Sequence, residues 1–161
     1  MSDWPEPVER VASFLRSSGT EVVIEEFQEG TPTARDAARA VGCELRQIVK
    51  SLVFRCDDRV LLVMVPGDRR ADTDKVAAAG GCERARVADA ELVLEATGFE
   101  PGAVAPFPLR RVDRVFADRN LLAVDRVWIG AGSTRHMAGI APADLMRLAR
   151  AQAIDAVEDA G

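Results

Sequence analysis

The chain has 161 residues, 48% of them hydrophobic, and its 21 basic and 26 acidic side chains leave a formal net charge of −5. A chain of this size and composition buries roughly two thirds of its unfolded surface, which excludes a disordered or collagen-like protein and predicts a single domain over residues 1–161. The acidic balance argues against a general polyanion binder, because sequence-independent affinity for nucleic acid comes from neutralising many phosphates.

Membrane and secretion signals are missing from the sequence. No apolar run approaches the roughly 20 residues that a membrane span requires, and residues 1–7 lack the basic start and apolar core of a signal peptide. We therefore expect a cytoplasmic protein that makes no membrane contact.

Helices and strands alternate along the chain without a repeat or a flexible linker. Apolar periodicity and end signals predict an α+β fold with a mixed sheet flanked by helices. The two central strands, over residues 47–55 and 59–65, are predicted to form an antiparallel hairpin. The predicted helices cover residues 6–17, 33–41 (with Thr31 or Thr33 as N-cap), 72–79, 89–97 and 142–151, and the predicted strands cover residues 20–27, 47–55, 59–65, 112–116 and 126–129.

Three cysteines, Cys43, Cys56 and Cys82, are an odd number without a C-x-x-C pair. This usage predicts reduced thiols. His136 is the only histidine and has no paired thiol near it in sequence, so neither a metal site nor a cofactor is expected. Dinucleotide, P-loop and hydrolase-elbow motifs are also missing.

Lysine is rare in this chain: of the 21 basic residues, only Lys50 and Lys75 are lysine and the other nineteen are arginine. Lys50 stands within a run of aliphatic residues, where an isolated ammonium group costs several kcal/mol or loses its proton. Two interpretations follow. Lys50 extends to solvent or pairs with a carboxylate, or it directs a compact charge into a cleft at an anionic ligand.

Two glycine-bearing segments are candidates for a ligand site. The first, over residues 97–106, contains Gly98, Gly102 and Pro106 and is long for a turn. The second, over residues 130–134, contains the glycines at 130 and 132 together with the serine at 133, and directly follows a predicted strand. Such segments present backbone N–H groups to an anion or a polarised carbonyl, although glycines serve folding at least as often.

Other reactive side chains have a structural interpretation of equal or greater weight. His136 is a candidate general base or water-orienting group, and equally a histidine without a catalytic role. Ser133 is expected to donate or accept hydrogen bonds rather than to act as a nucleophile. Cys43 is expected to be a buried, inert thiol, with a thiol-based enzyme as the alternative. The arginine-rich segment 110–126 is expected to be a solvated surface.

An ordered set of motifs resembles the YbaK/prolyl-tRNA synthetase-associated domain family. These motifs are Gly30–Thr33, Lys50–Leu52, Gly98–Pro106 and Gly130–Ser133, and the likeness runs from about Val8 to Ala151. The resemblance implies a twisted, largely antiparallel, barrel-like sheet. It also implies trans-editing, the hydrolysis of the ester that joins a wrong amino acid to its tRNA.

The resemblance also implies residue roles. Lys50 would hold the 3′ end of the tRNA, and the terminal ribose 2′-hydroxyl would activate water in place of a protein nucleophile. The implied partners are an aminoacyl-tRNA and a cognate synthetase. Two residues are predicted to be catalytic, Lys50 and His136, and eight are predicted to bind substrate: Thr31, Thr33, Gly98, Gly102, Pro106, Gly130, Gly132 and Ser133.

The identity of the amino acid removed stays open among alanine, cysteine and serine, with proline tRNA as the expected carrier. Thr33 stands where some branches that clear cysteinyl-tRNA carry an aromatic residue, and the region of Met137 lacks an acidic residue of that branch. His136 resembles a histidine of branches that clear alanyl-tRNA. The alternative function is a non-catalytic module that binds an aminoacyl-adenosine-like or small anionic ligand.

Overall fold

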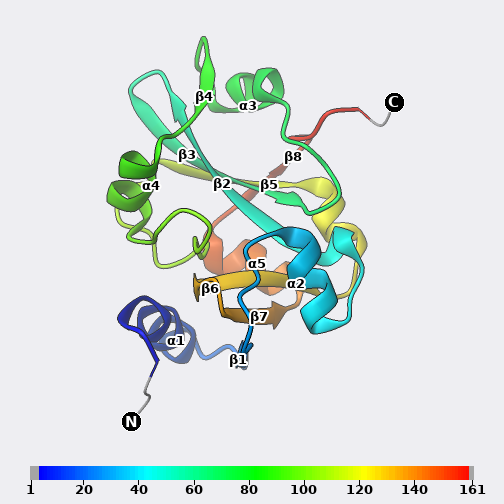
Figure 1. Cartoon of the computed structure of the whole chain (residues 1–161). Coiled ribbons are helices and arrows are strands. Elements are labelled where there is room, and N and C mark those ends of the chain that lie inside the picture. Colours follow the sequence, from blue (N-terminus) through cyan, green and yellow to red (C-terminus); the bar gives the residue numbers. More distant parts are fainter. Residues whose placement is uncertain (1–3, 160–161) are drawn as a thin grey trace.

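Two β-sheets form the framework of the computed structural model, which describes residues 4–159 (Figure 1). The larger sheet has the strand order β4-β2-β3-β5-β8, and the smaller has the order β1-β7-β6. The strands are β1 (Ile24–Glu26), β2 (Val49–Cys56), β3 (Arg59–Pro66), β4 (Ala85–Val87), β5 (Arg114–Asp118), β6 (Val127–Ser133), β7 (His136–Ile140) and β8 (Gln152–Ile154).

The strand pairing confirms the predicted α+β class with a mixed sheet. The β3–β5 and β5–β8 pairs are parallel, and the other pairs are antiparallel. The framework is divided into two sheets and does not close into a barrel. A parallel bridge between Ile48 and Trp128 joins the two sheets where the chain enters β2.

The β2–β3 hairpin is the centre of the larger sheet, as predicted, and is buried on both faces. Its register runs from Val49 opposite Pro66 to Cys56 opposite Arg59. Successive strand side chains point to opposite faces. Val53 accordingly enters the core cluster beneath α1, whereas Phe54 enters a second cluster with α3.

Five helices cover the sheets, and local end signals explain their bounds. They are α1 (Glu6–Ser18), α2 (Ala34–Val41), α3 (Thr73–Gly80), α4 (Ala90–Thr97) and α5 (Pro142–Ala149). Thr33 is the N-cap of α2 and accepts a hydrogen bond from the Asp36 N–H, while Asp72 and Asp89 cap α3 and α4 in the same way. Short 3-10 segments cover Leu45–Gln47 and Arg119–Ala123.

Several strands differ from the prediction. The strand expected over residues 20–27 is reduced to β1, and β4, β7 and β8 were not predicted. The glycine segment expected to be a turn after residue 129 belongs to β6, which continues to Ser133 with a register irregularity between Gly130 and Ser133. Pairing with β7 stabilises this segment as a strand, which the glycines alone do not indicate.

The helices of the described chain are short. None within residues 4–159 is both long and apolar enough to cross a membrane.

The expectation of three reduced thiols is wrong for two of them. Cys56 and Cys82 form a disulfide across 26 positions of sequence, with their Cα atoms 5.5 Å apart. The end of β2 and the turn after α3 meet only in the folded chain, so the sequence spacing did not reveal the pair. Cys43 is a free cysteine and is half-buried rather than buried.

We expect denatured, unreduced protein to titrate with one free thiol, from Cys43, and with three after reduction. Reduction, or the Cys56→Ser/Cys82→Ser change, is expected to lower the free energy of unfolding by about 3 kcal/mol, because the cross-link restricts the unfolded chain. Thiol titration and urea unfolding measure the two effects. Three free thiols before reduction would contradict this pairing.

Candidate functional site

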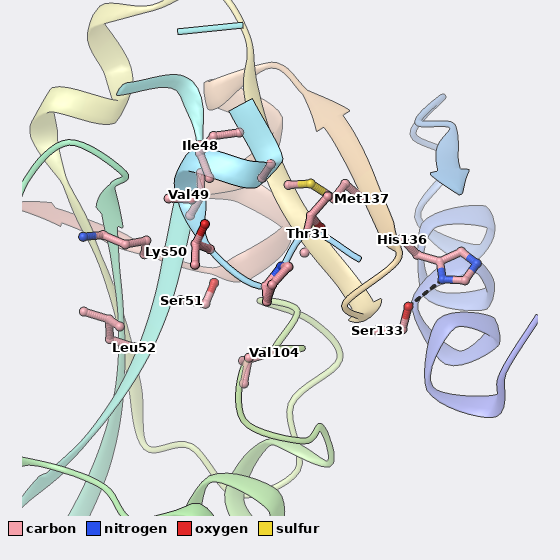
Figure 2. A pocket seen from close by; sticks show the side chains of 16 residues that line it. Thr31, Ile48, Val49, Lys50, Ser51, Leu52, Val104, Ser133, His136 and Met137 are labelled. Carbon is pink, nitrogen blue, oxygen red and sulfur yellow. Dashed lines mark hydrogen bonds between the residues drawn. The ribbon is translucent and has the colours of Figure 1, made fainter. Parts of the chain in front are cut away.

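A cavity of about 320 Å³ lies where the first half of β2 meets the segment before α2, the loop after α4 and the β6–β7 hairpin (Figure 2). Its walls are mainly apolar, with a few hydroxyl and charged groups. The lining residues are Thr31, Pro32, Thr33, Ala34, Ala37, Ile48, Val49, Lys50, Ser51, Leu52, Gly102, Val104, Gly130, Ser133, His136 and Met137. Such composition is typical of a small-molecule site.

Lys50 lies at one side of the cavity, on the second residue of β2. Its Nζ donates a hydrogen bond to the Arg69 carbonyl oxygen at 2.6 Å. Burial lowers the pKa of Lys50; the nearby Asp68 acts against this shift and Arg70 adds to it. Figure 2 shows the amine directed away from Ser133 and His136. The lysine therefore lines the cavity while its ammonium group is held by a backbone carbonyl rather than by a carboxylate.

Ser51 provides a polar atom without a partner. Its Oγ is buried and has no hydrogen-bond partner among residues 4–159, although the residue lines the cavity. A buried hydroxyl left without a partner costs roughly 1–3 kcal/mol. This is the feature expected of a group that a ligand completes, and it lies next to Lys50 on the same strand.

Ser133 and His136 form a hydrogen-bonded pair at the opposite side, across the β6–β7 turn. Ser133 Oγ lies 2.6 Å from His136 Nδ1 and accepts a hydrogen bond from the Arg135 N–H at 2.9 Å. The serine hydroxyl is thus placed to donate to Nδ1, which assigns the proton of the neutral imidazole to Nε2. Glu26 Oε2 lies 3.2 Å from Nε2, without hydrogen-bond alignment.

The His136 ring is only 2% exposed and points toward α1 in Figure 2. The Trp4 ring packs against it edge-on, with centroids 5.5 Å apart. Burial lowers the pKa of His136; Glu26 raises the pKa and Arg135 lowers it further. A neutral imidazole held in this way positions Ser133 at the cavity wall, and its own ring is directed away from the cavity centre.

Seven of the ten predicted site residues lie together in this cavity: Thr31, Thr33, Lys50, Gly102, Gly130, Ser133 and His136. The other three, Gly98, Pro106 and Gly132, lie outside its lining. Gly98 ends α4, and its carbonyl accepts a hydrogen bond from Arg10. Gly132 has a φ of 102°, and a Cβ there would lie 2.8 Å from the Pro7 backbone, so this glycine permits the close approach of α1.

Close approach also explains Gly130, where a Cβ would lie 3.0 Å from the Val104 carbonyl oxygen. The apolar wall was not predicted, because Ile48, Val104 and Met137 resemble ordinary core residues in the sequence. Ser51 had one signal, its position beside Lys50 in a motif that resembles the family, but only the structure reveals its unpartnered Oγ.

Other candidate residues lie outside the cavity. The Cys43 thiol donates to the Glu44 carbonyl oxygen, and burial followed by the Glu44 charge raises its pKa, which disfavours a reactive thiolate. Arg111 and Arg119 in the arginine-rich segment form exposed ion pairs with Glu95 and Asp155. Within residues 4–159, no group of three or more histidine, cysteine or acidic side chains is arranged to hold a metal ion.

Comparison with known proteins identifies the family. The aminoacyl-tRNA editing domain family matches residues 28–148. The protein YwhH of Bacillus subtilis (strain 168) is 34% identical over 123 residues, 76% of this chain and 78% of that protein. A solved structure of a candidate trans-editing enzyme for prolyl tRNA synthetase is 34% identical, with a TM-score of 0.91, and the match covers 98% of this chain and 100% of that chain.

The proline–tRNA ligase of Bacillus licheniformis is 34% identical over 121 residues, which make up 73% of this chain but only 21% of the ligase. The chain thus spans about a fifth of the synthetases that it matches. It belongs to the aminoacyl-tRNA editing domain family, which confirms the resemblance inferred from the ordered motifs.

Because His136 is the only histidine, its imidazole protons give a single titrating set of signals in NMR spectra. We expect its pKa to lie below the ordinary value of 6.5, because burial disfavours the charged ring. The unfolded chain then binds more protons at mildly acidic pH. The contribution of the neutral ring to stability is therefore complete above the unfolded pKa and declines as the pH falls below it.

The His136→Gln variant removes this histidine-dependent part of the stability profile. Urea unfolding of the two proteins between neutral and mildly acidic pH measures the difference. Titration of the imidazole at or above its ordinary value would show that the Glu26 charge outweighs burial.

Proposed function

We propose that the protein is a trans-editing aminoacyl-tRNA deacylase that removes a small amino acid from a mischarged tRNA. The observation that carries the proposal is the cavity, whose lining includes Lys50 and Ser51, with its unpartnered Oγ, from β2 and Ser133 from the β6–β7 hairpin, in a chain of the editing-domain family. The solved relative described as a candidate trans-editing enzyme supports action in trans.

The geometry supports a division of roles. Lys50 supplies the charged donor for the anionic 3′ end of the tRNA. When the tRNA binds, the Lys50 Nζ donates a hydrogen bond to a phosphate oxygen, either in place of its bond to the Arg69 carbonyl oxygen or in addition to it. Rotation about χ1 directs the Ser51 hydroxyl to a ribose hydroxyl or ester oxygen. His136 acts through Ser133, whose Oγ it holds at the cavity wall, and is therefore a positioning residue.

The reaction itself needs little from the protein, because an aminoacyl ester is already activated. The oxygen of a water molecule bonds to the ester carbonyl carbon, and the bond from that carbon to the ribose oxygen breaks. One proton of the water goes to the ribose oxygen, the other is released to solvent, and the amino acid leaves as its carboxylate. The terminal 2′-hydroxyl orients the water, while fixed donors stabilise the developing oxyanion.

The cavity volume supports a small substrate side chain. A volume of about 320 Å³ lies at the lower limit of ligand pockets, and Ile48, Val104 and Met137 restrict it with apolar surface. Exclusion by size rejects larger amino acids, whereas binding alone gains only about 1–3 kcal/mol per methylene. Alanine, serine and cysteine fit this requirement, and proline tRNA is the proposed carrier.

The editing domain is proposed to extend over the whole chain, residues 1–161. The family match covers residues 28–148, but Val8 and Val11 of α1 belong to the main core cluster and Val157 belongs to the second. Its proposed partners are the acceptor end of an aminoacyl-tRNA and a cognate synthetase. Its proposed place is the cytoplasm, where these partners meet.

The first test compares the two lysines of the chain on alanyl-, cysteinyl- and seryl-tRNA with a proline anticodon. Lys50→Met is expected to reduce kcat/KM by about 10- to 100-fold, because a charge-assisted contact to the tRNA is lost. Lys75→Met is the matched control. Lys75 lies on α3, outside the cavity, and pairs with Asp155 and Asp159. Deacylation should therefore persist in Lys75→Met.

Hydrolysis that is equal in wild type and Lys50→Met would remove Lys50 from the site. Intact esters across the whole panel at catalytic protein concentrations would exclude the deacylase and favour the non-catalytic binding module.

The second test replaces Ser51 by alanine. This change removes a buried unpartnered hydroxyl, so the free energy of unfolding is expected to rise by about 1 kcal/mol. Deacylation is expected to fall by about tenfold in kcat/KM, since the same hydroxyl contacts substrate. Opposite signs for stability and activity separate a substrate contact from a structural role. Loss of stability together with activity would contradict the assignment.

A further inference from the structure

Three exposed arginines gather at the far end of β2, away from the cavity. Arg55 belongs to β2, Arg86 to β4 and Arg84 to the segment just before β4. Together with Asp57 and Glu83, they line a shallow surface groove. Figure 1 shows β4 and the tip of the β2–β3 hairpin at the end of the molecule opposite α1. We call Arg55, Arg84 and Arg86 the arginine surface.

The register places two of these charges directly opposite each other. Arg55 pairs with Arg86 across the antiparallel β2–β4 ladder. Like charges in this position destabilise a sheet. None of the three guanidinium groups forms a salt bridge within the part of the chain that the structure describes, in contrast to Arg16 and Arg111. The folded chain thus keeps a repulsive arrangement that no salt bridge among the described residues offsets.

Protection of a sheet edge does not account for this arrangement. Charged side chains on an edge strand discourage pairing with other molecules, and β4 is an edge strand. Arg55, however, lies on β2, which is paired on both sides. Its charge is therefore not required to protect an edge, and an external anion remains as the group that would offset the repulsion.

The two acids of the groove do not neutralise the surface. The Asp57 carboxylate accepts a hydrogen bond from the Glu83 N–H at 3.3 Å, which holds it at the hairpin turn. The groove keeps one positive charge in excess, in a chain with a net charge of −5. The planar guanidinium group donates two parallel hydrogen bonds to a phosphate, which makes a cluster of arginines well suited to a phosphodiester backbone.

The distance from the cavity fits one elongated ligand. Ser51, which lines the cavity, and Arg55 share one face of β2 and are four residues apart, about 13 Å at roughly 3.3 Å per residue. A nucleic-acid duplex carries on the order of one phosphate charge per 1.7 Å of its axis, so a stem leaving the cavity passes several phosphates over this distance.

We propose that the arginine surface binds the phosphate backbone of the tRNA acceptor stem while the 3′ end occupies the cavity. The inference rests on the proposed function for the identity of the nucleic acid. It explains how an acidic protein holds a tRNA: recognition is confined to the cavity near the start of β2 and the arginine surface at its end, and the remaining negative charge keeps other polyanions away.

The test measures binding of uncharged, fluorescently labelled tRNA with a proline anticodon by anisotropy over a series of KCl concentrations. Arg55→Gln/Arg86→Gln is expected to raise Kd about tenfold and to make the slope of log Kd against log salt less steep by about 2, one unit for each lost phosphate contact. Glu83→Gln is expected to tighten binding, because it removes a negative charge from the groove.

Matched variants separate charge from folding. Arg16→Gln, on α1, removes one arginine far from the surface and should leave Kd unchanged. Arg55→Lys/Arg86→Lys keeps both charges and should restore most of the salt slope. The unfolding temperature of Arg55→Gln/Arg86→Gln should equal or exceed that of wild type, because the cross-strand repulsion is removed.

A Kd and salt slope unchanged in Arg55→Gln/Arg86→Gln would overturn the inference. Hydrolysis of an alanyl-CCA trinucleotide, too short to reach the arginine surface, tests the proposed function separately. If such trinucleotides and the full-length tRNAs charged with alanine, cysteine and serine all remain intact, the proposed deacylase activity is excluded, while the anisotropy result still decides whether the arginine surface binds tRNA.

Discussion

The double burial of β2 is the constraint on which the rest of the structure depends. This strand is paired with β3 and β4 along its edges, and its alternate side chains enter two different core clusters. Where the chain enters β2, the Ile48–Trp128 bridge joins the larger sheet to the smaller one. The Gly67 N–H donates to the Ile48 carbonyl oxygen at 2.8 Å, and a Cβ on Gly67 would lie 2.6 Å from the Leu45 carbonyl oxygen. This close packing fixes the start of β2 and with it the position of Lys50.

The cavity lies at the junction of the two sheets, where regular pairing stops and polar groups are left available. Lys50 depends on a single backbone carbonyl, and Ser51 Oγ has no partner among the described residues. Both features cost stability, since charged and polar groups lose hydration on burial. The extensive apolar core on both sides of the hairpin offsets that cost. The candidate site therefore lies beside the doubly buried strand β2 rather than on a loop.

Local interactions explain why much of the fold was predictable. Caps such as Thr33 and Asp89 and left-handed glycines such as Gly98 mark helix ends within a few residues, and the aliphatic runs of the central hairpin leave an equally local pattern. The three-residue strands β4 and β8 carry no such pattern, because their partners alone make them strands. The Cys56–Cys82 disulfide has the same origin, since two distant segments meet only after folding.

By itself, the sequence determined the α+β class, the central hairpin, the helices and the family resemblance, and it singled out Lys50, since these follow from periodicity, capping and motif order. The tertiary structure decided which candidates share a cavity: it placed Gly132 against α1, turned the His136 ring toward Trp4 and left Ser51 Oγ without a partner. It also set Arg55 opposite Arg86. The physical reason is that burial, cross-strand register and the pairing of polar atoms are relations between residues far apart in the chain, and no single segment contains them.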